Sequence, residues 1–275
     1  MPELPETETI ARDLHAAIAG EPISGVTVTH ADVLREVTTR ALRARVTDTT
    51  IVRVWRRAKL VVIDLSSGDH IVVQPRFTGG LLIDAGDLPG AARRYSAVAF
   101  ALSGGRILHY RDIRRLGTVA LMSPARFATY SGSIGPEPLD PGFTADNLSG
   151  VLRSSRQAVK KVIMDQRHLA GIGNIYANES LWRSGIDPSR RANRVEPQRA
   201  ASLRDALVGV LSEAIAARGT SFRDYRDAHG ERGGFAEKLD AYGRAGLPCR
   251  RCGSRLIGTH AVDGRATVFC AHCQR

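Results

Sequence analysis

Residues 249–273, CRRCGSRLIGTHAVDGRATVFCAHC, contain all four cysteines of this 275-residue chain. They form two CxxC pairs, Cys249 with Cys252 and Cys270 with Cys273. Zinc prefers four soft ligands in a tetrahedron, and each CxxC turn can bring two thiolates to one point. Free or disulfide-bonded cysteines are the alternative, but cytosolic cysteine pairs more often bind metal. The spacing therefore predicts one structural Zn²⁺ with no open coordination position, in a zinc ribbon or hairpin.

A helical region precedes this tail, because apolar residues at helical spacing predict helices over 159–164, 175–182 and 201–217. Gly171-Ile172-Gly173-Asn174 forms a glycine-rich turn between the first two helices. The free N–H groups at such a helix start can bind an anion, and the side chain of Asn174 adds a donor. A DNA phosphate would suit this turn, although a tight helix corner without any ligand fits the same pattern.

The chain up to about residue 122 is rich in predicted strands. Ile10, Leu14 and Ile18 first predict a helix that ends at Gly20, with Pro5 in its first turn. Apolar and polar residues then alternate in short runs separated by turn residues, which predicts a β-sandwich or barrel. The predicted strands are 23–28, 51–54, 60–65, 70–73, 81–83, 97–102 and 119–121.

Residues 123–150 contain four prolines with interspersed Gly and Ser, which predicts a linker. We therefore expect an α+β protein in four parts. A β-sandwich with an N-terminal helix (1–122) and the linker (123–150) would precede a helical domain (151–240) and a zinc finger (241–275).

The charge of the chain favours a polyanionic partner. Thirty-nine Lys and Arg against 28 Asp and Glu give a net charge of +11. One basic cluster, Arg53, Arg56, Arg57 and Lys59, surrounds Trp55. No apolar stretch approaches the roughly 20 residues of a membrane span, and the N-terminus lacks the features of a signal peptide. We expect a cytoplasmic protein that does not bind membranes.

Pro2, at the extreme N-terminus, can act as a nucleophile once Met1 is removed. Its secondary amine would attack a sugar C1′ and form an iminium, which accepts electrons well. An α-amino group has a pKa of about 7.7–8.0, so a useful fraction is neutral at physiological pH. Glu3 is adjacent and could transfer protons. In isolation, the pair would more often be an incidental N-terminal sequence.

Six motifs give this pair a context, because together they resemble the bacterial formamidopyrimidine-DNA glycosylase family. They resemble its opening, lysine loop, DNA-wedge loop, linker, helix–two-turn–helix and zinc finger, in that order, over nearly the whole chain. The motifs are Met1-Pro2-Glu3-Leu4-Pro5-Glu6-Thr7-Glu8-Thr9, Arg57-Ala58-Lys59, Asp112-Ile113-Arg114-Arg115-Leu116-Gly117, Ile134-Gly135-Pro136-Glu137-Pro138-Leu139, residues 165–179 and residues 242–274.

The resemblance implies a role for each matching residue. Pro2 would form a Schiff base with the deoxyribose, and Glu3 would donate and accept protons. Lys59 would contact phosphate and assist β-elimination, and Arg265 would bind phosphates and assist δ-elimination. Taken alone, Lys59 and Arg265 could equally be solvated surface charges. The resemblance also implies a supporting carboxylate at Glu6 and DNA contacts at Asn174 and Lys160.

The chain departs from the family where the DNA wedge is expected. The family typically fills the gap left by the flipped base with Met, Arg and Phe, whereas this chain has Phe77, Arg114 and Leu116. Tyr95 begins a segment that is usually rich in His. Because an extruded nucleotide leaves a hole that must be filled, these changes bear on substrate choice.

The sequence thus predicts a glycosylase with AP lyase activity in base excision repair. We expect it to act as a bacterial, nucleoid-associated monomer on double-stranded DNA that contains damaged bases or abasic sites. Oxidised purines, 8-oxoguanine and formamidopyrimidines, are the first expectation because Glu3-Leu4-Pro5-Glu6 matches that branch. One alternative is an endonuclease VIII-like enzyme for oxidised pyrimidines, and another is a zinc-finger protein that binds damaged DNA without catalysis.

Overall fold

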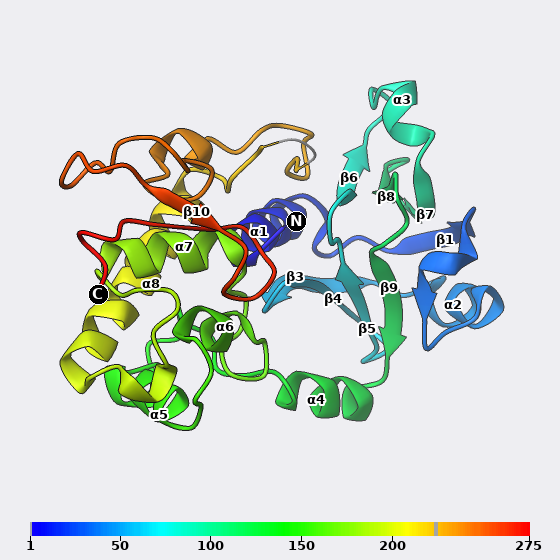
Figure 1. Ribbon diagram of the computed structural model, residues 1–275. Helices are drawn as coiled ribbons and strands as arrows, with labels where there is room; N and C mark the ends of the chain where they lie inside the picture. The colour runs from blue at the N-terminus through cyan, green and yellow to red at the C-terminus, as the bar shows by residue number, and fades with distance from the viewer. Residues whose placement is uncertain (1, 223–224) are drawn as a thin grey trace. The chain divides into compact units, whose positions relative to one another are not determined.

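A computed structural model describes residues 2–222 and 225–275, and it divides the chain into two compact units (Figure 1). The first, here called the sandwich unit, comprises Met1–Gly132 and Ala217–Gly234. The second, the helical unit, comprises Ser133–Ala216 and Phe235–Arg275. No helix in the described part of the chain is long and apolar enough to cross a membrane.

The sandwich unit contains two β-sheets, which confirms a sandwich over a barrel. One sheet has the strand order β1-β7-β8-β6, and the other has the order β2-β9-β5-β4-β3. Neighbouring strands are antiparallel except for β2 and β9. The strands are β1 (Ile23–Val28), β2 (Leu34–Arg35), β3 (Ile51–Arg57), β4 (Leu60–Leu65), β5 (His70–Gln74), β6 (Gly79–Asp84), β7 (Ser96–Leu102), β8 (Ile107–Asp112) and β9 (Thr118–Met122).

Helices of the sandwich unit cover parts of these sheets. Helix α1 (Leu4–Ile18) packs on β3, and its apolar face (Ile10, Leu14, Ile18) enters the same core as residues of both sheets. The predicted N-terminal helix is thus confirmed, with proline in its first turn. The other helices are η1 (Ala31–Val33), α2 (Thr39–Val46), α3 (Gly90–Arg93) and α4 (Pro124–Gly132).

The helical unit is built around α8 (Pro197–Ala216), against which α5 (Ala145–Arg153) and α7 (Asn174–Arg183) pack. Helix α6 (Val159–Met164) packs on α7, which also contacts β11. The predicted helices 159–164, 175–182 and 201–217 correspond to α6, α7 and α8. The remaining elements are η2 (Ala192–Arg194), η3 (Phe235–Lys238), β10 (Ile257–Thr259) and β11 (Thr267–Phe269).

The structure differs from the sequence prediction in several places, and α2 and β2 are among the elements that were not predicted. Strand β8 lies between β6 and β7 although no strand was predicted there. The predicted linker contains α4, which starts at Pro124, and α5, which Thr144 and Asn147 begin as a capping box. Residues 217–234, expected in the helical domain, belong to the sandwich unit. Each difference depends on local capping or long-range packing that hydropathy does not show.

Candidate active site and metal centre

The first described residues, from Pro2 on, are buried at the N-terminus of α1. Pro2, Glu3 and Glu6 are all buried. The backbone N–H of Glu3 donates to Oε2 of Glu6 at 2.8 Å, and the two residues form a reciprocal capping box. This arrangement fixes the backbone directly after Pro2. Met1 lies outside the described residues, so its removal stays a prediction.

The second oxygen of Glu6 connects α1 to the returning segment 217–234. The backbone N–H of Thr220 donates to Oε1 of Glu6 at 2.7 Å. The hydroxyl of Tyr225 donates to the main-chain carbonyl oxygens of Glu6 (3.4 Å) and Arg218 (3.2 Å). Gly219 has a φ of +86°, and a Cβ there would lie 3.0 Å from the Glu6 carboxylate. The carboxylate of Glu6 therefore holds two segments that are more than 200 residues apart in sequence.

Lys59 lies in the tight turn between β3 and β4. Ala58, beside it, is buried and has a φ of +52°, a left-handed conformation that is unfavourable for a residue with a Cβ. The carbonyl oxygen of Ala58 accepts a hydrogen bond from Oγ1 of Thr7 at 3.4 Å. This contact places the turn beside the first turns of α1, so the structure brings Pro2, Glu3, Glu6 and Lys59 to one end of that helix.

The arginines around Trp55 have partners within the sandwich unit. Arg53 pairs with Asp64, and its guanidinium lies 4.7 Å from the centre of the Trp55 ring. Arg56 pairs with Glu8 at 2.8 Å, and Arg57 donates to Ser131. A large part of this predicted basic cluster therefore stabilises the fold.

Two loops of the sandwich unit present the expected wedge residues. Phe77, between β5 and β6, is 48% exposed, and Leu116, between β8 and β9, is 40% exposed. Arg114 is also exposed, and its guanidinium lies 5.7 Å from the centre of the Phe77 ring, a cation–π distance. Tyr95 precedes β7 and is half-buried, and its carbonyl oxygen accepts from the N–H of Asp112 at 3.0 Å.

In the helical unit, β10 and β11 form a hairpin whose turn carries Arg265. The Arg265 side chain is exposed. The carbonyl oxygen of Ala266, the next residue, accepts from Nζ of Lys160 (3.2 Å) and from Nδ2 of Asn174 (2.9 Å). Nζ of Lys160 also donates to Oγ1 of Thr267 at 2.6 Å. One side chain from α6 and one from α7 thus fix the turn that presents Arg265.

The placement of Lys160 bears on its expected phosphate contact, which stays a prediction. Its side chain is fully buried, and its ammonium lies 3.6 Å from the Asp263 carboxylate. The ammonium donates to the hairpin turn, so a contact with phosphate would require that turn to move. Asn174 is half-buried, and its amide already donates to the hairpin. In this structure both residues position the turn.

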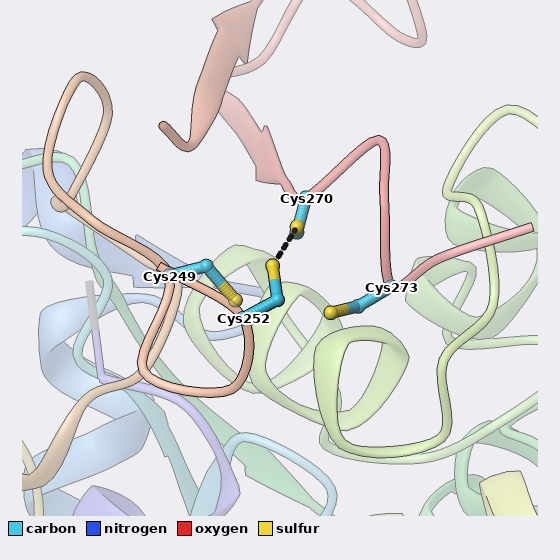
Figure 2. Close-up of side chains that lie close together, drawn as sticks. All are labelled: Cys249, Cys252, Cys270 and Cys273. Carbon is cyan, nitrogen blue, oxygen red and sulfur yellow. Dashed lines mark hydrogen bonds between the residues drawn. The ribbon is translucent and has the colours of Figure 1, made fainter. Parts of the chain in front are cut away.

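Figure 2 shows that the four cysteines point toward one another from two segments. All four sulfur atoms lie within 4.8 Å of one another, and those of Cys252 and Cys270 are 3.5 Å apart. Tetrahedral coordination at about 2.3 Å requires sulfur separations of roughly 3.8 Å, so the cluster fits a metal ion. Burial and the neighbouring sulfurs raise the pKa of Cys273 to about 12, an effect that a bound cation would reverse. Cys249 and Cys270 are buried together with Trp182 of α7.

Glu179 ties the segment before the cysteines to α7. Its buried carboxylate accepts from the backbone N–H groups of Asp240 (2.8 Å), Ala241 (2.9 Å) and Tyr242 (2.8 Å). Burial raises the pKa of Glu179, although these three donors oppose the shift. The cysteine cluster is therefore attached to the helices by polar contacts on both sides.

Comparison with known proteins agrees with this geometry. The formamidopyrimidine-DNA glycosylase N-terminal domain matches residues 1–119, and the H2TH domain of the same enzyme matches residues 134–226. Formamidopyrimidine-DNA glycosylase of Pelotomaculum thermopropionicum is 39% identical over 100% of this chain and 99% of its own length. That of Xanthomonas campestris pv. campestris is 41% identical over the full length of both. The chain belongs to the formamidopyrimidine-DNA glycosylase family.

Solved structures of the family share the whole fold. A Lactococcus lactis Fpg variant in complex with Fapy-dG-containing DNA is 30% identical, with a TM-score of 0.91 and full coverage of both chains. Lactococcus lactis Fpg with abasic-site DNA is 29% identical, with a TM-score of 0.90 and 99% coverage of both. As a family member the chain is a DNA glycosylase of DNA repair, with an α+β fold and a zinc-finger-like cysteine cluster.

Sequence reasoning on this glycosylase missed several residues that organise the site. Asp112 and Glu179 lie inside quoted motifs but received no role. Thr220 acts through its backbone N–H, which leaves no mark in a sequence. Only for Asn178 did the sequence contain a clue, because it lies four residues after Asn174 and therefore on the same face of the helix. In the structure its Oδ1 accepts from the backbone N–H of Val268 in the hairpin at 2.7 Å.

Proposed function

We propose that this family member is a bifunctional glycosylase and AP lyase that removes oxidised purines, with Pro2 as its nucleophile. The observation that carries the proposal is that Pro2 and Glu3 are buried at the start of α1, where Glu6 accepts from the backbone N–H groups of Glu3 and Thr220. A nucleophile that precedes one carboxylate in the chain, in a backbone that a second carboxylate anchors, suits covalent catalysis with proton transfer.

The reaction begins when the neutral amine of Pro2 attacks C1′ and the bond from C1′ to the base breaks. The base leaves with the bonding electron pair and a proton. The Pro2 nitrogen then gives up its proton and its lone pair forms an iminium with C1′, while the C1′–O4′ bond breaks and O4′ takes the bonding pair and a proton. Loss of a C2′ proton then expels the 3′ phosphate in β-elimination, and a second elimination expels the 5′ phosphate. Glu3 would move the protons of these steps, while Lys59 and Arg265 would hold the phosphates.

Oxidised purines are the proposed substrates for two reasons. The opening Pro2-Glu3-Leu4-Pro5-Glu6 matches the branch that acts on them, and the relatives are named formamidopyrimidine-DNA glycosylase. The Lactococcus lactis neighbours were solved with DNA that contains Fapy-dG or an abasic site. A net charge of +11 supports binding to DNA. The proposed setting is the bacterial cytoplasm, with the protein acting as a monomer. The ion in the cysteine cluster would be zinc, which four thiolates suit, and it would stabilise the hairpin fold.

Covalent trapping tests the nucleophile. Borohydride should reduce the iminium and leave the protein attached to DNA with an abasic site, and mass spectrometry should place the adduct on Pro2. A tag that blocks the amine should abolish trapping, whereas the same tag at the C-terminus should not. An adduct on Lys59 would contradict the assignment.

A lesion panel tests the substrate. Duplexes with 8-oxoguanine, a formamidopyrimidine or an oxidised pyrimidine should be compared in single turnover. Faster release of the purine lesions is expected, and a preference for the pyrimidine would favour the endonuclease VIII-like alternative. DNA binding without any base release would favour a non-catalytic zinc-finger protein.

A further inference from the structure

The two wedge loops of the sandwich unit, residues 75–78 and 113–117, meet at one buried carboxylate. Asp112 is 2% exposed and lies at the end of β8. Its Oδ1 accepts from the hydroxyl of Thr78 (2.5 Å) in the first loop and from the N–H of Arg114 (3.2 Å) in the second. Its Oδ2 accepts from the N–H of Gly117 (2.7 Å) and from the hydroxyl of Tyr110 (3.2 Å).

Thr78 also links the loops directly, because the N–H of Arg114 donates to its Oγ1 at 3.0 Å. Thr78, Asp112 and Arg114 therefore form a closed triangle of hydrogen bonds that spans both loops. Burial, followed by the nearby Asp112 carboxylate, raises the pKa of Tyr110 well above its usual range, so the phenol remains a donor. The carboxylate of Asp112 is thus surrounded by four hydrogen-bond donors.

The backbones of the two loops also pack without spare room. A Cβ on Gly117 would lie 2.6 Å from the carbonyl oxygen of Gln74, the last residue of β5, and 2.7 Å from that of Pro75 in the first loop. The residues directly before the two exposed apolar side chains, Arg76 and Arg115, have φ values of +53° and +51°. Such left-handed conformations at residues with a Cβ persist where surrounding contacts determine them.

We propose that Asp112 is a positioning residue that joins the two loops into one rigid element, so that Phe77 and Arg114 enter damaged DNA as a single wedge. The 5.7 Å cation–π contact between these two side chains is the product of that coupling. This inference rests on the proposed function, because it takes the exposed pair to fill the gap left by a flipped nucleotide. Asp112 itself would touch neither DNA nor the reacting atoms.

Thr78→Val is the informative variant, because it removes the cross-loop hydroxyl and leaves Asp112, Tyr110 and Gly117 in place. We expect single-turnover excision from a lesion duplex to slow by roughly tenfold, the effect of losing a hydrogen bond to a charged group. Excision from the same strand without its complement should not change, since no hole has to be filled. Thr78→Ser keeps the hydroxyl and should restore the duplex rate. Thr129→Val is the matched control, because it removes a hydroxyl that donates within α4.

A fluorescence measurement reports the wedge itself. With 2-aminopurine opposite the lesion, binding of the unmodified protein should raise emission as the wedge unstacks that base, and Thr78→Val should lose this rise at saturating protein. Asp112→Asn should show at least the same losses. Should Asp112→Asn fail to fold, Thr78→Val alone decides.

The double substitution of Phe77 and Arg114 by Ala adds a coupling test. In an otherwise unmodified protein, the losses of excision rate caused by Phe77→Ala and by Arg114→Ala should be non-additive. In a protein that also carries Thr78→Val, the two losses should be additive. An unchanged ratio of duplex to single-strand rates in Thr78→Val, with a normal 2-aminopurine signal, would overturn the positioning role. Failure of the unmodified protein to trap an abasic site would instead overturn the proposed function, so the two failures are distinguishable.

Discussion

The two units hold their exposed functional residues by different means. In the sandwich unit, loops emerge from two sheets with a shared core, and single buried carboxylates such as Glu6 and Asp112 bind their backbone N–H groups. In the helical unit, the hairpin that carries Arg265 has a core of only a few side chains, among them two cysteines. It is held by the ammonium of Lys160, by amide donors and by the cysteine cluster.

This difference shows how the size of the local core determines the anchors that a loop needs. The sheet fixes both ends of a loop that connects two of its strands, so one buried carboxylate is enough to restrain the rest of the loop backbone. A short hairpin gains little from apolar burial, and a metal ion can then supply the folding free energy. The two units should therefore fail differently when their anchors are removed.

The largest expected effect is on chemistry in the sandwich unit. Glu3→Gln should reduce base excision by about 10²- to 10⁴-fold, because it removes a proton-transfer group and leaves a side chain of equal size. DNA affinity should stay close to that of the unmodified protein. Single-turnover kinetics measure the first quantity, and fluorescence anisotropy measures the second.

Glu8→Gln is the matched control, since Glu8 lies in the same helix but pairs with Arg12 and Arg56. It should excise at nearly the normal rate. Excision by Glu3→Gln at the rate of this control would remove Glu3 from the catalytic scheme.

The second effect is on binding in the helical unit. Cys249→Ser should lose the metal, and with it the ordered hairpin and much of the affinity for DNA. Elemental analysis should find one zinc per chain in the unmodified protein and none in the variant. Circular dichroism should retain the β-sheet signal of the sandwich unit, because no cysteine lies within it.

Treatment with a chelator, followed by added zinc, provides the reversible control. Affinity should fall on chelation and return with the metal. A variant that keeps both metal and full affinity would contradict the four-cysteine site.

The strands and helices with regular patterns could be predicted from sequence, and those without could not. Predicted ranges 23–28, 60–65 and 159–164 match β1, β4 and α6. Strand β8 was not predicted because His109 and Arg111 interrupt its apolar pattern. In the structure it is largely buried between β6 and β7. The return of residues 217–234 to the sandwich unit depends on contacts such as Glu6 with Thr220, which no local pattern records.

The candidate site divides in the same way. The cysteine spacing alone predicted that the four thiols lie close enough together to hold a metal ion, since each thiol belongs to a side chain with specific chemistry. The roles of Pro2 and Glu3 needed the family resemblance. The burial of Lys160 was not predictable, because lysine is rarely buried and its acceptor is a backbone carbonyl 106 residues away.

A third effect compares the two loops within the sandwich unit. Phe77→Ala should slow excision from duplex DNA more than Leu116→Ala, because base–aromatic stacking contributes about 1–3 kcal/mol and leucine offers only apolar bulk. The difference between the rate losses of the two variants should be smaller on single-stranded substrates. Single-turnover rates on both substrates check this, and equal losses in both variants would assign Phe77 to packing.

The smallest expected effect separates a positioning lysine from a phosphate contact in the helical unit. Each phosphate contact adds about one unit to the slope of log affinity against log salt. Arg265→Ala should therefore lower the slope by about one.

Lys160→Met should weaken binding in the unmodified protein, because the turn that presents Arg265 loses an anchor. Adding Lys160→Met to Arg265→Ala should change neither the DNA affinity nor the salt slope much further, since the Arg265 side chain that Lys160 positions is already absent. Lys161→Met, one residue along and exposed, is the control for loss of a nearby charge. A further drop of about one in the slope of the Lys160→Met, Arg265→Ala double variant would show that Lys160 binds a phosphate after all, and that the hairpin moves to expose it.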